Sequence, residues 1–189
     1  MPESQGWGPD VKLTYDDYVL FPEDGLRHEL IDGEHYVTPS PNLRHQDIIG
    51  RLHLIIGNWL QVHPVGRVYF APLDVLFSRY DVVEPDLLFV SNARSAVLAE
   101  KYIQGAPDLA VEVASSSTRQ RDDTIKLDLY ERFGVSEYWT VDPVAESMTV
   151  RRRAGDRFGQ PVILTRAAGD VLRTDLLPGL AVELVRVFE

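Results

Sequence analysis

Two apolar segments of the sequence each carry one acidic residue that hydrophobic patterning does not explain. Asp86 begins an apolar run that continues to Val90, and Glu112 lies inside the apolar run of residues 109–113. An ionised carboxylate in apolar surroundings costs several kcal/mol unless it is paired or binds a metal. Lys126 follows on the next predicted helix. Two carboxylates on neighbouring strands and one ammonium group predict a divalent-metal site with a cationic partner.

The predicted strand that carries Glu112 has two faces of different composition. Side chains alternate along a strand, so the branched aliphatic residues of 109–113 share one face, and Glu112 shares the other with Asp108 and Ala110. A second face that meets solvent would account for the acid without any function. We favour an interior strand, because structure is predicted on both sides of the run and the alternate positions are otherwise small.

Asp86 and Lys126 each have a structural alternative. Asp86 follows Pro85, and an acid at a strand end commonly caps a turn. Lys126 comes four residues after Asp122, a spacing typical of an exposed helical ion pair. Lys126 also borders the apolar face of its helix, so its side chain can equally point toward the strand that carries Glu112. The sequence leaves both interpretations of Lys126 open.

The remaining candidates for chemistry give weaker signals. Glu29 lies in a predicted hairpin beside two aliphatic residues, which indicates partial burial. The five histidines show no metal-ligand spacing, and we interpret His45 as a helix-terminal side chain rather than a general base. The serines at 115–117 lack the G-x-S-x-G elbow of serine hydrolases, which disfavours that chemistry.

Length and composition indicate one soluble domain over residues 1–189 with a substantial core. Hydrophobic residues make up 44% of the chain, yet no run approaches the roughly 20 apolar residues that cross a bilayer. The first ten residues lack the basic and apolar regions of a signal peptide. The absence of cysteine excludes disulfides and thiolate metal sites, and it favours a cytoplasmic location.

The charge balance bears on possible partners. Twenty-nine acidic residues against 19 Lys and Arg give a formal net charge of −10. This charge opposes broad attraction to DNA, which depends on Lys and Arg neutralising phosphates. It leaves room for a nucleic-acid enzyme, because a local basic groove or bound cations can offset the global charge.

The pattern of apolar residues and turn signals predicts an α/β (α+β) chain with the following elements. We expect a loose leader over 1–12, a short helix after Thr14, and a hairpin over 27–38 that turns at Asp32-Gly33. A helix should follow from the cap Asn42 to about Val62, then paired strands over 67–78 and 82–90 and a short helix within 91–102. The remaining elements are a strand over 108–114, a helix over 119–133 ended by Gly134, a strand over 137–141, and a β-rich tail over 147–189. Strand, helix and strand in succession indicate a crossover with parallel strands.

Six segments in this order resemble the Uma2 family (DUF820). They are R-H-E-L-I-D-G-E, A-P-L-D-V, E-P-D-L-L-F-V, G-A-P-D-L-A-V-E-V-A-S-S-S-T, D-D-T-I-K-L-D-L-Y-E-R-F-G-V and E-Y-W-T-V-D. The family consists of restriction-endonuclease-like proteins of the PD-(D/E)XK nuclease superfamily. The resemblance covers about residues 13–142, and it implies a mixed central β-sheet flanked by helices, followed by a β-rich C-terminal extension over 143–189.

The resemblance also implies roles for particular residues. Asp86 matches the first-motif aspartate, Glu112 the second-motif acid, and Glu29 the acid that precedes the core strands. The superfamily places its lysine two residues after the second acid, where this chain has Ala114. Uma2-like sequences place a lysine on the following helix instead, which corresponds to Lys126.

These roles imply a DNA endonuclease that depends on Mg²⁺ or Mn²⁺. Asp86, Glu112 and Glu29 would hold the metal, and Lys126 would orient the nucleophile or stabilise phosphoryl charge. The alternative is a catalytically silent binding or assembly module that keeps the acids as a polar cluster. A small-molecule hydrolase has no support in the sequence. We also expect a homodimer, because symmetric pairs are the commonest oligomers.

Overall fold

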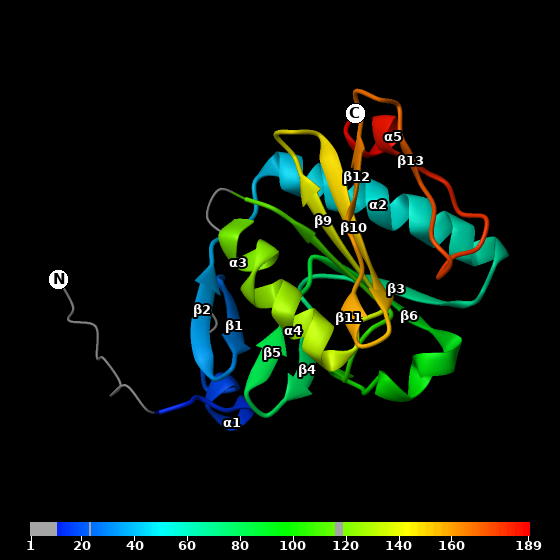
Figure 1. Ribbon diagram of the computed structural model, residues 1–189. Coiled ribbons are helices and arrows are strands. Elements are labelled where there is room, and N and C mark those ends of the chain that lie inside the picture. The colour runs from blue at the N-terminus through cyan, green and yellow to red at the C-terminus, as the bar shows by residue number, and fades with distance from the viewer. Residues whose placement is uncertain (1–10, 23, 116–118) are drawn as a thin grey trace.

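A larger mixed β-sheet and a smaller sheet beside it form the framework of the protein (Figure 1). The computed structural model describes residues 11–22, 24–115 and 119–189, so nearly all of the predicted leader lies outside the described residues. The larger sheet consists of β3 (Gly66–Phe70), β6 (Leu87–Ser91), β8 (Leu109–Val113), β9 (Glu137–Asp142), β10 (Ser147–Ala154), β11 (Arg157–Phe158) and β12 (Val162–Thr165). Its strand order is β11-β10-β9-β8-β6-β3, and β12 also pairs with β10. The parallel pairing of β8 with β9 confirms the predicted crossover.

The smaller sheet carries the N-terminal hairpin. It consists of β1 (Arg27–Ile31), β2 (Glu34–Thr38), β4 (Val75–Ser78), β5 (Asp81–Val83) and β7 (Ile103–Gln104), in the order β2-β1-β5-β4-β7. The hairpin turns at Asp32 and Gly33, which both have positive φ (52° and 76°). This backbone conformation is the one that Asp-Gly favours in a two-residue hairpin turn. The predicted hairpin and its turn are therefore present.

Helices cover both faces of the larger sheet. On one face lies α2 (Leu43–Val62), whose apolar stripe packs against alternate residues of β6 and β8. On the other face lies α4 (Ile125–Phe133), which packs with Ala110 of β8 and with residues of the smaller sheet. Figure 1 shows α2 behind the sheet and α4 in front of it. Both faces of β8 are consequently buried, and the alternative of a solvent-facing strand surface around Glu112 is wrong.

Capping residues set the ends of these helices where the sequence predicts them. The Asn42 side chain accepts a hydrogen bond from the backbone N–H of His45 (2.9 Å), which fixes the first turn of α2. Gly134 ends α4 in the left-handed conformation with φ of 84°. A glycine adopts this conformation without steric cost, so α4 stops there and β9 begins three residues later.

Three predicted elements are divided in the structure. The predicted strand over 67–78 is two strands in different sheets, β3 and β4, and the predicted strand over 82–90 is β5 and β6. The divisions fall at Pro72 and Pro85, because proline has no N–H to continue a ladder. The predicted helix over 119–133 is α3 (Arg119–Asp123) and α4, separated at Thr124, whose ψ of −75° departs from helical backbone.

The other elements are short. They are α1 (Tyr15–Tyr18), a 3-10 helix η1 (Asn92–Val97), β13 (Val171–Leu172), β14 (Val182–Glu183) and α5 (Leu184–Val187). The predicted β-rich tail thus extends the larger sheet through β10 to β12 and ends in a helix that packs on α2. Among the described residues, none of the helices has the length and apolar character to cross a membrane.

Two glycines provide a matched test of this packing. An added Cβ at Gly66 on β3 would lie 2.4 Å from the Val90 carbonyl oxygen and 2.5 Å from the Phe89 ring, whereas one at Gly50 on α2 would meet open space. We expect Gly66→Ala to lower the free energy of unfolding by about 1–3 kcal/mol. Gly50→Ala should raise it by up to about 1 kcal/mol through helix propensity. Urea denaturation measures both, and equal effects would contradict the packing described.

Candidate active site

A buried lysine joins three elements of the fold. Lys126 of α4 is fully buried, and its Nζ lies 2.7 Å from Oε1 of Glu112 on β8. The same Nζ lies 2.8 Å from Oε1 of Glu29 on β1. One ammonium group therefore bridges a carboxylate from each sheet, and the alternative of an exposed helical ion pair at Lys126 is wrong.

Further donors surround the two glutamates. The Tyr130 hydroxyl donates to Glu112 Oε1 at 2.6 Å, from one turn along the helix that carries Lys126. The backbone N–H of Glu84 donates to Glu29 Oε1 at 3.1 Å. The Arg121 guanidinium lies 3.4 Å from Glu29 Oε2. Buried carboxylates require such partners, because an unpaired buried charge is strongly unfavourable.

Asp86 lies next to this cluster because of the strand register. Leu87 pairs with Val111 across the antiparallel β6–β8 ladder, so Asp86, one residue earlier, comes opposite Glu112. Directly opposed residues on an antiparallel pair point to the same face. The backbone N–H of Val113 also donates to Asp86 Oδ2 at 2.7 Å, which fixes the carboxylate at the end of β8.

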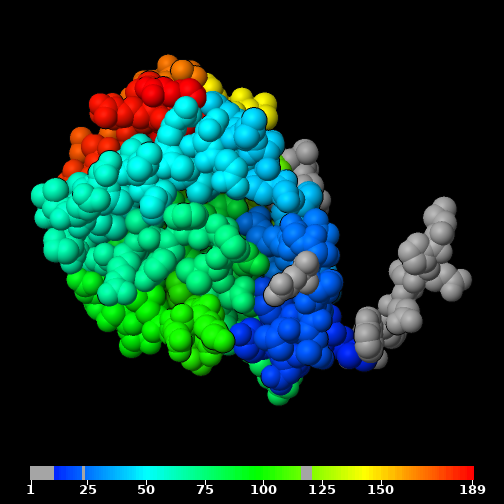
Figure 2. Space-filling view, turned by 180° about the vertical axis from the view of Figure 1, so that it is seen from behind, coloured from blue at the N-terminus to red at the C-terminus, as the bar shows by residue number. Residues whose placement is uncertain are grey.

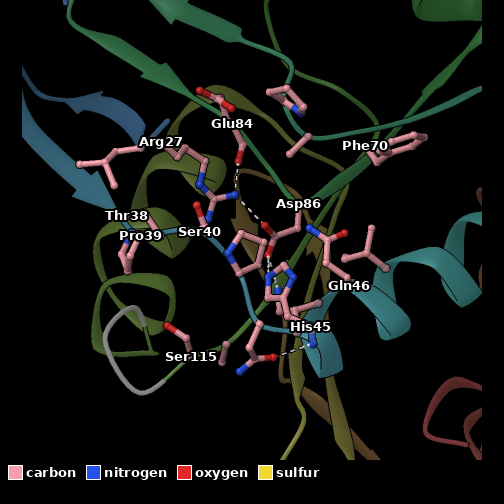
Figure 3. A pocket seen from close by; sticks show the side chains of 18 of the residues that line it. Arg27, Thr38, Pro39, Ser40, His45, Gln46, Phe70, Glu84, Asp86 and Ser115 are labelled. Carbon is pink, nitrogen blue, oxygen red and sulfur yellow. Dashed lines mark hydrogen bonds and ion pairs between the residues drawn. The ribbon is translucent and has the colours of Figure 1, made fainter. Parts of the chain in front are cut away.

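Two further side chains hold Asp86 from the outer side (Figure 3). Arg27 Nη1 donates to Asp86 Oδ1 at 2.6 Å and to the backbone oxygen of Glu84 at 3.1 Å. His45 Nε2 lies 3.0 Å from Asp86 Oδ2. The helix start places His45 here, since it follows the Asn42 cap in the first turn of α2. Asp86 is thus held by groups from the hairpin, from α2 and from β8.

A cavity of about 490 Å³ opens beside Asp86. Its lining includes Arg27, His45, Asp86, Phe70, Gln46 and Ala114. Figure 2 shows this face of the molecule, where the blue residues of the N-terminal part of the chain and the cyan residues of α2 border the green residues between them. Ala114, two residues after Glu112, also lines this cavity, and the ammonium group that contacts Glu112 comes from α4.

Burial and charge act in opposite directions on the paired glutamates. Burial raises the pKa of Glu112 to about 8, and the Lys126 ammonium opposes that rise. Burial also acts to raise the pKa of Glu29, but Lys126, followed by the neighbouring arginines, holds it below its usual value. The pKa of Lys126 is raised, because the carboxylates of Glu112 and Glu29 outweigh the effect of burial.

Asp86 is the most strongly acidic member of the site. Burial alone would raise its pKa, but the His45 hydrogen bond and the Arg27 guanidinium hold the pKa of Asp86 well below its usual range. The neighbouring Glu84 behaves oppositely, because burial raises its pKa to about 7. The cavity therefore has one firmly ionised carboxylate at its floor and one that takes up a proton near neutral pH.

The structure brings the four residues singled out from the sequence into one cluster. Glu29, Glu112 and Lys126 are in direct contact, and Asp86 is adjacent through the β6–β8 register. Sequence reasoning missed the contact of Arg27 with Asp86, and it interpreted His45 as a helix-terminal side chain only. Alternation along β1 was a usable signal for Arg27, because residues 27 and 29 share one strand face.

The donor set agrees in its chemistry with a hard cation. Mg²⁺ and related ions bind oxygen ligands and take one or two carboxylates together with waters and substrate phosphates. Asp86 and Glu112 supply two such carboxylates on one face of the sheet. The part of the chain that the structure describes contains no group of three or more acidic, His or Cys side chains already placed around an ion position.

Comparisons with known proteins agree with this architecture. Residues 15–185 match the Uma2 family, whose description is "putative restriction endonuclease". A crystal structure of a putative nuclease belonging to DUF820, from Anabaena variabilis ATCC 29413, matches with a TM-score of 0.79 and 19% sequence identity. The match covers 93% of this chain and 97% of that chain. At this identity the match shows a shared fold, which confirms the fold class expected from the sequence. A search of curated proteins gives no match.

Replacing Lys126 tests how far the cluster stabilises the fold. Lys126→Met leaves Glu29 and Glu112 buried without their shared cation, and removing one partner of a buried ion pair costs about 3–5 kcal/mol. We expect the free energy of unfolding in urea to fall by about that amount. Lys101→Met, at an exposed lysine, is the control and should change it by less than about 0.5 kcal/mol. Similar losses in both variants would show that the bridge contributes little.

The raised pKa of Glu112 predicts a dependence of stability on pH. The folded state keeps the Glu112 proton up to about pH 8, whereas the unfolded chain releases it near the ordinary value of 4.5. The contribution of this group is therefore fully present below pH 4.5 and is lost as the pH rises to 8. Glutamine does not titrate, so the stability of Glu112→Gln relative to wild type should increase by more than about 2 kcal/mol from pH 5 to 8. Urea denaturation across this range measures the difference. A constant difference, or one that matches the exposed control Glu100→Gln, would contradict the assignment.

Proposed function

The chain belongs to the Uma2 family, and from that premise we propose that it is a Mg²⁺- or Mn²⁺-dependent nuclease that hydrolyses DNA phosphodiester bonds. One observation carries the proposal. The buried Lys126 pairs with Glu112 and Glu29, Asp86 lies opposite Glu112 in the β6–β8 register, and Asp86 lines a cavity. Two carboxylates and an ammonium group, with one of the carboxylates in the lining of a cavity, are groups that metal-assisted phosphodiester hydrolysis uses.

In this proposal Asp86 and Glu112 would hold the ion, and Glu29 would support it through Lys126 or through water. A bound divalent ion supplies a Lewis acid for the phosphate and lowers the pKa of a water. Lys126 orients Glu112 and contributes positive charge toward the phosphoryl oxygens. An ammonium group suits both tasks, because it offers three donors and two of them suffice for the glutamates.

Arg27 and His45 have complementary roles beside the ion. Arg27 pairs with Asp86 Oδ1 in the structure, so an ion that binds this oxygen competes with the guanidinium. Once displaced, Arg27 is placed to bind the substrate phosphate, for which its planar donors are well suited. His45 fixes the other carboxylate oxygen of Asp86 and so keeps the side chain directed at the cavity.

The contacts that Asp86 already makes also support the alternative function, a catalytically silent binding or assembly module. Both oxygens of this carboxylate already accept hydrogen bonds, from Arg27 and from the backbone N–H of Val113, and His45 lies at hydrogen-bonding distance. A catalytically silent module would use the same contacts as a structural polar cluster. The two functions differ in whether a divalent ion displaces Arg27.

A plasmid-nicking assay with Mg²⁺ or Mn²⁺ tests the proposed function. We expect wild type to nick supercoiled DNA, and Asp86→Asn to reduce the rate by at least about 100-fold, because the ion contributes several kcal/mol of transition-state stabilisation. Asp108→Asn is the matched control. Asp108 is also a buried acid at a strand end, but it contacts Ser91 and Arg94 at the opposite end of β8.

The outcomes separate the two functions. Loss of nicking in Asp86→Asn with retention in Asp108→Asn supports the nuclease. Equal nicking by all three proteins rejects the assignment of Asp86. Absence of nicking by wild type, together with no heat of Mn²⁺ binding in calorimetry, supports the silent module.

A further inference from the structure

We propose that the cavity beside Asp86 binds one unpaired nucleotide of the substrate, so that the protein acts on single strands, flaps and frayed ends rather than on continuous duplex. This inference rests on the proposed function, because it names the class of DNA that reaches the proposed active site. Three observations support it: Asp86 and Glu112 are buried below the surface, the cavity has a suitable size and lining, and the ring of Phe70 is exposed.

The acidic side chains are recessed below the molecular surface. The side chain of Asp86 is 4% exposed and that of Glu112 is 2% exposed. A duplex is a stiff rod whose stacked bases hold each phosphate at its outer surface. A phosphate on a flexible unpaired strand can enter such a recess at little cost, whereas a duplex must be bent or unstacked to bring its phosphate there. The depth of the site therefore favours a strand that is already unpaired.

The cavity has the size and the lining of a nucleotide site. Its volume of about 490 Å³ lies within the range of roughly 300–1,000 Å³ found for small-molecule sites. Its walls are largely apolar and include Pro39, Pro72 and Ile49, which suit the faces of a base. The exposed Gln46 and Ser40 also line it and offer hydrogen-bonding groups to a base edge or a sugar. Arg27 lines the cavity beside Asp86, where its guanidinium is available to a phosphate of the bound nucleotide (Figure 3).

Phe70 provides a stacking surface at this cavity. It ends β3, lines the cavity and is 52% exposed, so a ligand in the cavity can reach its ring. The ring of His53 on α2 packs against it edge-on, with centroids 4.8 Å apart and planes at 73°. An aromatic ring held in place by a neighbour while its surface stays exposed is the platform that proteins use to stack unpaired bases.

The net charge supports the same class of substrate. Extended duplex binding depends on many Lys and Arg contacts to phosphates, and the chain has a formal charge of −10. A single nucleotide held by stacking and one guanidinium requires no broad basic surface. The acidic balance, which opposes duplex binding, is therefore compatible with an unpaired strand end.

Binding of two fluorescein-labelled DNAs tests this inference. Fluorescence anisotropy compares single-stranded oligothymidine with a blunt hairpin duplex, in Ca²⁺ as a hard cation with similar ligand preferences. We expect wild type to bind oligothymidine at least ten-fold more tightly than the duplex. Phe70→Ala should weaken binding to oligothymidine by roughly 5- to 100-fold, the range for loss of one base–aromatic stack. Phe70→Tyr keeps a ring and should retain binding.

Ile163→Ala is the control variant, because Ile163 is an exposed hydrophobic residue on β12 outside the cavity lining. The same DNAs are then incubated with Mn²⁺ and analysed for cleavage. Equal cleavage of duplex and single strand, with Phe70→Ala behaving like Ile163→Ala, overturns the nucleotide site and leaves the nuclease proposal intact. Ring-dependent binding of oligothymidine without cleavage supports the nucleotide site and overturns the nuclease. Failure of wild type to bind oligothymidine overturns the nucleotide site.

Discussion

The structure depends on one ammonium group held in the protein interior. Lys126 has no contact with solvent, so its charge must be balanced by the buried acids that it touches. Glu29, whose pKa is lowered, supplies the negative charge, and Glu112 adds to it as it loses its proton near pH 8. Those residues come from the smaller sheet, the larger sheet and the helix that packs on both. The ion pairs thereby fix the position of the hairpin relative to the central strands. Three apolar residues at positions 29, 112 and 126 could pack the same elements, but no ionisable group would then lie next to Asp86.

The same arrangement explains why the candidate site lies where the two sheets meet. Asp86 precedes β6 of the larger sheet, and the cation that pairs with it, Arg27, begins β1 of the smaller sheet. In the structure this contact across the two sheets occupies Oδ1 of Asp86. In the proposed function this pair would separate. Asp86 would then bind the divalent ion, and Arg27 would bind the substrate phosphate. Metal binding, substrate binding and the position of the hairpin would then be linked through one guanidinium group.

Much of the fold follows from local signals, whereas the site depends on register and long-range packing. Asn42, Asp32-Gly33 and Gly134 mark boundaries that the structure confirms, because caps and turns depend on nearby residues. The divided strands at Pro72 and Pro85 were missed, since the sequence alone does not assign the two halves to different sheets. The acids at 86 and 112 were identifiable as exceptions to apolar patterning. The contacts of Arg27 and His45 with Asp86 were missed, because they join residues 41 to 59 positions apart. Strand alternation placed Arg27 on the same face as Glu29, but it did not identify Asp86 as its partner.

The central claim is that Asp86 and Glu112, positioned through Lys126 and the β6–β8 register, form a site for a hard divalent ion. A crystal structure of the protein soaked in Mn²⁺, with anomalous scattering recorded for manganese, tests it most directly. The account predicts an anomalous peak roughly 2.0–2.3 Å from a carboxylate oxygen of both residues, with the Arg27 side chain turned away from Asp86. A crystal at saturating Mn²⁺ that has no peak there, and in which Arg27 still pairs with Asp86, would contradict it.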